Sequence, residues 1–272
     1  MKNVLAISFV SCCILVSGCG KLSAIEDQAE VATAAGDVMS SFDESSGTEG
    51  GFALLEAPLL QSGGACFSTA LLSSCSDKTR TRTFEDCTIG LVNTLNGTVT
   101  LSFSETGCAM NIAGNSVTRT ADFTLTAPRG TLTVSAPGGG QVITRTADGF
   151  TYRVGGMKRV LKTSSGVTVA DVETKTLGDI TVTGTSRANR VMNGGSIEIK
   201  HVTRDYTAVL TPNNLAWTAG CVCAVSGTLT GTVTGAQSSD DVVVEMTGCG
   251  TAKITANGIS EDVKLDRCGA TS

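Results

Sequence analysis

The sequence predicts an all-β protein in which a long antiparallel meander forms a β-sandwich or an incomplete barrel, with one amphipathic helix near the amino terminus. Three observations predict this fold. After about residue 80, apolar residues alternate with Thr and Ser at a period of two. Turn signals such as Asn257-Gly258 separate the alternating segments. Residues after position 62 show no long helical periodicity, so the one predicted helix lies before the sheet.

The first element is an apolar run with the pattern of an export signal. Lys2 supplies a positive start, and the run from Val4 to Val16 is shorter than an ordinary membrane-spanning helix requires. The run ends in Val16-Ser17-Gly18-Cys19, which resembles the lipobox of bacterial lipoproteins. This resemblance implies that residues 1–18 are a lipoprotein signal peptide and that Cys19 carries the lipid. An ordinary cleaved signal with an incidental Cys is the alternative.

The lipobox resemblance also implies a location. Lipoproteins of this family carry two or more acyl chains, which is enough for stable anchoring in a membrane. Gly20 follows the Cys where Asp would favour retention in the inner membrane, so the resemblance implies an outer-membrane protein. The membrane is therefore the expected partner, through the amino-terminal lipid anchor. The periplasmic and surface leaflets both stay open.

Residues 19–62 are predicted to form a lipidated tether with an amphipathic helix and a linker. Apolar residues recur at spacings of three and four, and they form an Ala-rich stripe that suits close packing on a sheet. The stripe contains Leu22, Ile25, Ala29, Ala32, Ala35, Val38 (or Met39) and Phe42. From Leu22 to Asp77 the chain has nine acidic residues and no basic one. The segment is therefore either a solvated acidic tether or a segment that docks on a basic face of the domain.

The third segment, residues 63–272, is predicted to be a disulfide-stapled β-domain. Val99, Leu101 and Phe103 alternate with Thr100 and Ser102, as in an antiparallel strand that is buried on one face. The predicted turns are Pro128-Arg129-Gly130, Pro137 to Gly140, Asp148-Gly149, Asn193-Gly194-Gly195 and Asn257-Gly258. The apolar face of such a meander has to close on itself, pack on a second sheet or be covered by a helix.

Cysteine usage supports an oxidising compartment. Cys12 and Cys13 lie in the signal and Cys19 is the expected lipid site, which leaves eight cysteines for up to four disulfides. The candidates are Cys66, Cys75, Cys87, Cys108, Cys221, Cys223, Cys249 and Cys268. They form two groups of four at the two ends of the domain, so we expect pairing within each group.

Spacing narrows these pairings. In the first group we expect Cys66–Cys75 and Cys87–Cys108, because these cysteines are neighbours in the sequence. Cys221 and Cys223 would share one face of a strand, so each should bond to Cys249 or Cys268 rather than to the other. A zinc site is the weaker interpretation, because paired C-x-x-C knuckles are missing.

Two basic groups form a possible patch for anionic ligands such as a lipid headgroup or an envelope polymer. The first group alternates with Thr along an extended segment, and the second lies near the middle of the chain. The patch residues are Lys78, Arg80, Arg82, Lys158, Arg159 and Lys162. Solubility and protection of a sheet edge are the alternative roles.

The sequence has no catalytic signature. The single histidine, His201, lies in an extended segment in which strand geometry would place Asp205 roughly 13 Å away. No G-x-S-x-G nucleophile motif is present. We therefore expect a structural or surface His, no catalytic residue, no metal site and no cofactor.

The remaining motifs indicate where the protein is located but do not indicate a chemical activity. Cys87-Thr88-Ile89, the segment 95–101 and the closing segment 263–268 make the chain similar to uncharacterised β-rich envelope lipoproteins of Gram-negative bacteria. A pI near 5.0 argues against nucleic acid as a partner. We expect a non-enzymatic structural or interaction module, whose oligomeric state the sequence leaves open. The alternatives are a carrier of a lipid or other hydrophobic ligand in an open β-barrel, and an envelope glycan hydrolase that uses carboxylates.

Overall fold

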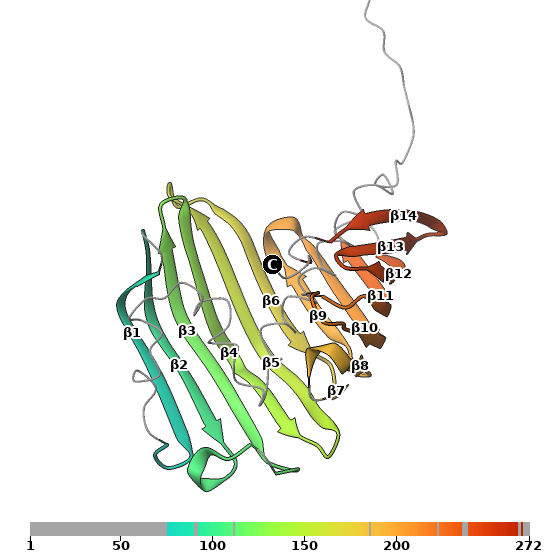
Figure 1. Cartoon of the computed structure of the whole chain (residues 1–272). Coiled ribbons are helices and arrows are strands. Elements are labelled where there is room, and N and C mark those ends of the chain that lie inside the picture. The colour runs from blue at the N-terminus through green and yellow to red at the C-terminus, as the bar shows by residue number, and fades with distance from the viewer. Residues whose placement is uncertain are drawn as a thin grey trace, which may run out of the picture.

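The protein is all-β over the part of the chain that the computed structural model describes. The described residues are 75–89, 92–110, 112–184, 186–221, 223–235, 239–265 and 268. They form a single 14-stranded antiparallel sheet with short 3-10 turns (Figure 1). No helix within these ranges is long and apolar enough to cross a membrane. The predicted signal peptide, Cys19, the amphipathic helix and the linker lie outside the described residues.

The strands follow one another along the chain and, for the most part, across the sheet. Their bounds are β1 Thr79–Ile89, β2 Asn93–Phe103, β3 Ser116–Ala127, β4 Gly130–Arg145, β5 Gly149–Thr163, β6 Thr168–Thr176, β7 Ile180–Thr183, β8 Val191–Asn193, β9 Ile197–His201, β10 Tyr206–Ala216, β11 Ser226–Gly235, β12 Ser239–Gly248, β13 Thr251–Ala256 and β14 Ile259–Lys264. The 3-10 turns are η4 Thr106–Cys108, η5 Arg187–Asn189 and η6 Val202–Arg204. Antiparallel neighbours in this order confirm the meander that the alternating pattern predicts.

Strands β5 and β10 are connected by two routes. The main path runs through β6 and β9, and the second runs through β7 and β8 at the other end of the same strands. The path begins at β1 and ends at β14, so the described strands form one open sheet. Figure 1 shows that the sheet twists across its width, with β1–β5 as long strands on one side and β12–β14 turned away on the other.

One face of the sheet carries the core, and we call it the inner face. Ile199, Ala208, Leu210, Leu229 and Val244 on this face are 0% exposed. The opposite face, called the outer face, carries mostly Thr, Ser and charged residues. This division confirms the predicted alternation of apolar and polar positions along the strands.

A row of paired residues crosses nine strands of the inner face. Its members, from β1 to β11, are Phe84, Gly97, Phe123, Val134, Arg159, Val172, His201, Tyr206 and Gly235. Gly97 lies between two aromatic residues, where a Cβ atom would overlap Phe123 and the carbonyl of Asp122. Glycine there lets the two Phe side chains share the space above the strand.

The turn predictions are confirmed in four places and wrong in one. Asn257 and Gly258 have φ values of 52° and 79°, as a tight hairpin between β13 and β14 requires. The segment from Pro137 to Gly140 is not a turn, because it lies inside β4 as an irregularity in the pairing with β5. Proline and glycine are tolerated at such bulges, where a ladder hydrogen bond is already lost.

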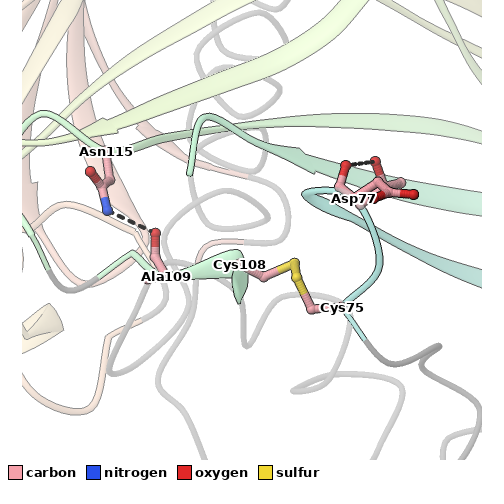
Figure 2. The surroundings of a disulfide bond; sticks show 6 residues. Cys75, Asp77, Cys108, Ala109 and Asn115 are labelled. Carbon is pink, nitrogen blue, oxygen red and sulfur yellow. Dashed lines mark hydrogen bonds between the residues drawn. A yellow bond between two sulfur atoms is a disulfide. The ribbon is translucent and has the colours of Figure 1, made fainter. Parts of the chain in front are cut away.

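Disulfides join the ends of the domain to the sheet. Cys75, which precedes β1, is bonded to Cys108 at the end of η4 (Figure 2). Next to this bond, the side-chain amide of Asn115 donates a hydrogen bond of 3.1 Å to the carbonyl of Ala109. The predicted pairs Cys66–Cys75 and Cys87–Cys108 are therefore wrong, because Cys75 and Cys108 are bonded to each other. Cysteines that follow one another in the sequence are not the ones that meet beside β1 and β2.

The carboxyl-terminal group pairs as its spacing predicts. Cys221 is bonded to Cys249, and Cys223 is bonded to Cys268. Cys221 and Cys223 lie in the connection between β10 and β11, and their partners lie beyond β12 and β14. Cys87 is also disulfide-bonded.

Candidate functional site: the inner face and its arginines

The inner face has a set of arginines among its apolar residues. Arg80, Arg82, Arg119 and Arg159 belong to β1, β3 and β5, and Arg190 precedes β8. Arg82 and Arg190 are 1% and 3% exposed, while the other three are half-buried. A buried guanidinium needs hydrogen-bond acceptors or an anion to offset the loss of water. These five residues, named here the inner arginines, therefore form the most unusual electrostatic feature of the described sheet.

Strand alternation places Arg82 in the core of the first strands. It lies between Arg80 and Phe84 on the inner face of β1 and pairs with Val99, which is 1% exposed. Its guanidinium carbon is 5.7 Å from the centroid of the Phe84 ring, within the range of a cation–π contact. Arg190 makes a similar contact of 5.8 Å with the ring of Phe150.

A short chain of polar side chains begins at Arg119. Its guanidinium donates to the side-chain carbonyl of Gln141 over 3.3 Å, and the Gln141 amide donates to the Tyr152 hydroxyl over 3.2 Å. Gln141 and Tyr152 are 2% and 1% exposed. The pairing of β3, β4 and β5 brings these three residues together. The chain provides an ordered polar environment for one side of the Arg119 guanidinium.

Lysines are placed on the opposite, outer face. Lys158 forms salt bridges of 3.1 Å with Asp171 and 3.1 Å with Glu173 on β6. The hydrogen bonds that its ammonium donates, first to Asp171 and then to Glu173, raise the pKa of Lys158 above its ordinary value. A second pair of 2.8 Å joins Lys175 to Glu198. Lysine is strongly hydrated, whereas a planar guanidinium is better suited to partly dehydrated ion pairs.

The six predicted patch residues do not form one exposed surface. Lys78 is exposed in the turn before β1, and its ammonium donates to the carbonyl of Ser104 over 2.6 Å. Arg80 and Arg82 lie on the inner face with Arg159, because strand alternation directs them there. Lys158 and Lys162 lie on the outer face. Adjacent residues of a strand point to opposite faces, so Lys158 and Arg159 cannot serve one ligand together.

A shallow pocket lies at one end of the sheet, beside His201. It has a volume of about 420 Å³ and is lined by Lys200, His201, Val202, Asp205, Tyr206, Thr207, Thr234 and Gly235. His201 is 4% exposed, and its ring atom Nδ1 is 3.1 Å from the Thr203 hydroxyl. The ring centroids of His201 and Tyr206 are 5.3 Å apart.

Asp205 and His201 are two titratable side chains of the described lining of this pocket. Among the described residues of its lining, Asp205 is the one carboxylate, whereas glycoside hydrolysis ordinarily uses two carboxyl groups that face each other. Asp205 follows η6 in the left-handed conformation, with φ 54°. His201 is held instead by Thr203 and Tyr206 at the end of β9. Within the described residues, the lining of the pocket therefore offers hydrogen bonding to a small polar group.

Sequence reasoning missed two of the inner arginines. Arg119 lies between Val117 and Ala121 in a strand with alternating apolar residues, so the period-two pattern contained the signal that places it on the inner face. Arg190 lies in a connection between short elements, where no periodicity applies. Its place beside Phe150 comes from the second route through β7 and β8.

Comparisons add no assignment for this site. Across the described ranges, no group of three or more His, Cys, Asp or Glu residues is placed to hold a metal ion. No family model, curated protein or solved structure matches the chain.

Proposed function

We propose that the chain is a lipid-anchored protein of the outer membrane, whose β-domain is a non-enzymatic structural or interaction module. The lipobox pattern at Cys19 supports the anchor, and the membrane is the partner it implies. The disulfides at both ends of the sheet support an oxidising envelope compartment.

The burial of the apolar side chains on the inner face is the observation that carries this proposal. A carrier of lipids requires apolar surface that a ligand can reach, as in the mouth of a barrel. The large apolar residues Ile180, Leu210, Leu215, Leu229 and Ile254 are 0% exposed instead. These side chains are packed in the core, where they stabilise the fold. Their burial favours a module that contacts other molecules through its outer face and its edges.

The open sheet is best described as an incomplete barrel in this proposal. Its strands meander in sequence order, its edges are β1 and β14, and its apolar residues share the inner face. An edge strand in such a sheet is normally covered or charged. β14 fits this rule, because Glu261, Asp262 and Lys264 make it highly charged.

Membrane attachment is tested by comparing the wild-type chain with Cys19→Ala in cells of a Gram-negative host. We expect the wild-type protein to sediment with outer membranes and to enter the detergent phase. The variant should remain unprocessed or should lose its lipid. Recovery of the wild-type protein in the aqueous phase without lipid would contradict the anchor.

The interaction-module part is tested on the purified protein. Native mass spectrometry should give the mass of the lipidated polypeptide alone, and a panel of ester, peptide and glycan substrates should not be turned over. A co-purified acyl ligand bound apart from the anchor would favour the carrier. Hydrolysis that is lost in His201→Ala would favour an enzyme centred on the pocket at β9.

A further inference from the structure

Three turns of the sheet lie at one end of the long strands (Figure 1). They connect β1 to β2, β3 to β4 and β5 to β6, and the antiparallel order of these six strands brings them to the same end. Thr94 pairs with Thr126, which places the first turn beside the second. The backbone amide of Ser164 donates a hydrogen bond of 3.2 Å to the carbonyl of Arg129, which places the third turn beside the second. The described residues of these turns, named here the turn edge, are 92, 127–130 and 161–169.

The turn edge exposes large apolar side chains. Their exposed fractions lie between 39% and 63%, and the residues are Val92, Leu161, Val167 and Val169. Three of the four belong to the β5–β6 hairpin, whose turn is closed by a hydrogen bond of 2.8 Å from the Thr163 amide to the Val167 carbonyl. A single exposed apolar side chain is ordinary on a protein surface, whereas several at one end of a molecule mark a contact with a partner or a membrane.

The same edge has positive charge and contains no Asp or Glu. Arg129 and Lys162 are exposed there. The segments that lead into and out of the three turns are also without Asp and Glu, over residues 87–104, 123–147 and 149–170. The next carboxylate along the chain, Asp171, forms a salt bridge of 3.1 Å with Lys158. Exposed cations beside exposed apolar side chains therefore make the turn edge complementary to a surface that is anionic and partly apolar.

The direction of the side chains at this edge favours a surface that meets the ends of the strands. Leu161 and Lys162 are adjacent in β5, so their side chains point to opposite faces of the sheet. A ligand on one face would meet one of the two, whereas a surface across the strand ends contacts both. A lipid bilayer is such a surface, because apolar side chains enter the boundary of headgroups and acyl chains while cations stay level with the headgroups.

We propose that the turn edge lies against a lipid bilayer with anionic headgroups, with Val167 and Val169 at the acyl boundary and Arg129 and Lys162 beside headgroup phosphates. This inference rests on the proposed membrane attachment for the nearness of a bilayer. An anchor alone leaves the domain free to rotate, whereas a second contact fixes its orientation. The strands then stand on the membrane, and the outer face remains free to bind other molecules.

The contact is tested without the anchor, on the full mature chain with Cys19→Ser, exported by a conventional signal so that it carries no lipid. Flotation measures its partition onto vesicles of phosphatidylcholine and phosphatidylglycerol, and onto phosphatidylcholine alone. We expect partition onto the mixed vesicles to be at least about tenfold stronger, because each Lys or Arg near an anionic surface contributes about fivefold. Equal partition, or none onto either, would overturn the proposal and would leave the anchor at Cys19 unaffected.

Matched variants of the unlipidated chain locate the charge contact. Arg129→Gln/Lys162→Gln removes two charges from the turn edge, and Lys253→Gln/Lys264→Gln removes two exposed charges from β13 and β14. We expect the first variant to partition onto the mixed vesicles about tenfold more weakly and the second to partition like the parent chain. Retention of the three disulfides described above checks that each variant has folded. Equal losses in the two folded variants would contradict a contact through the turn edge.

Apolar contact is tested on the lipidated chain in vesicles that contain a brominated phospholipid. Val167→Trp places a fluorophore on the turn edge, and Ile112→Trp places one in the exposed connection between β2 and β3, at the opposite end of the strands. The natural Trp217 is buried and gives the same background in both variants. We expect bromine to quench the emission of Val167→Trp and not that of Ile112→Trp.

Equal quenching of the two variants, or quenching of neither, would overturn the membrane contact. Both variants carry the same anchor, so a failure of the anchor appears as loss of flotation in both. Such a failure is thereby distinguished from a failure of the contact, which the unlipidated chain measures independently.

Discussion

Cys223 and Cys268 are joined by a disulfide across 45 residues of the chain. The bond connects the loop before β11 to the residues that follow β14, the last strand of the sheet. Cys221, two residues before Cys223, is bonded in turn to Cys249 in the turn between β12 and β13. The loop between β10 and β11 is therefore bonded at two points to the segment that contains the last four strands. These bonds secure β14, an edge strand that has a neighbour on one side only.

The Cys223–Cys268 bond is predicted to contribute substantially to stability. Replacing both residues by Ser should lower the free energy of unfolding by about 2–4 kcal/mol, because the unfolded chain regains the freedom of a long loop. The measurement is urea unfolding of the oxidised protein, with the reduced wild type as the control. An unchanged midpoint in the double variant would show that the edge strands are held by other contacts.

Gly231 is predicted to be required for the close packing of β11 on β10. It pairs with Leu210, and a Cβ atom at this position would overlap the carbonyl of Val209 on β10. Gly231→Ala should cost about 1–3 kcal/mol or more, as overpacking does in a tight core. Gly235→Ala in the same strand meets nothing within 4 Å and is the matched control. Similar losses in thermal unfolding for the two variants would refute a steric cause.

Lys158 is predicted to give a small, pH-dependent stabilisation. Its ion pairs with Asp171 and Glu173 are partly exposed, so Lys158→Met should cost about 0.5–1 kcal/mol. These pairs raise the pKa of Lys158 above 10.5, so the stabilisation is fully present below pH 10.5 and is lost as the pH rises through the raised pKa. Unfolding of both proteins at pH 7 and above pH 11 measures this difference, which should shrink at the higher pH.

Leu229 is predicted to be a core residue of the inner face. It is 0% exposed, and Leu229→Ala should lower the free energy of unfolding by about 2–5 kcal/mol because it leaves a cavity. Val243 on the neighbouring strand is 40% exposed on the outer face, and Val243→Ala should cost far less. Equal costs would mean that the two faces are not divided into a core and a surface as the burial pattern indicates.

The strand pattern was predictable because it depends on local alternation. Thr and apolar residues at a period of two are enough to assign Val99, Leu101 and Phe103 to one apolar face, and all three are buried on the inner face. The irregularity in β4 was not predictable in this way. Pro137 and three glycines have the composition of a turn, and only pairing with β5 on one side and β3 on the other keeps the strand continuous.

Contacts between distant residues were harder to predict. Cys75 bonds to Cys108 because η4 returns the chain to the start of β1, a relationship that spacing does not encode. Arg82 fits the expected alternation with Arg80, but the alternation does not say which face is buried. Its burial beside Phe84 follows from the register of β1 on β2.

Intact-mass analysis of the protein isolated from outer membranes, without reduction, tests the central claim most directly. We expect a chain that begins at Cys19 with acyl groups attached, carries no other ligand and has lost eight hydrogens to four disulfides. An unmodified amino terminus would contradict the lipid anchor, and an additional bound hydrophobic mass would contradict a closed, non-carrier module.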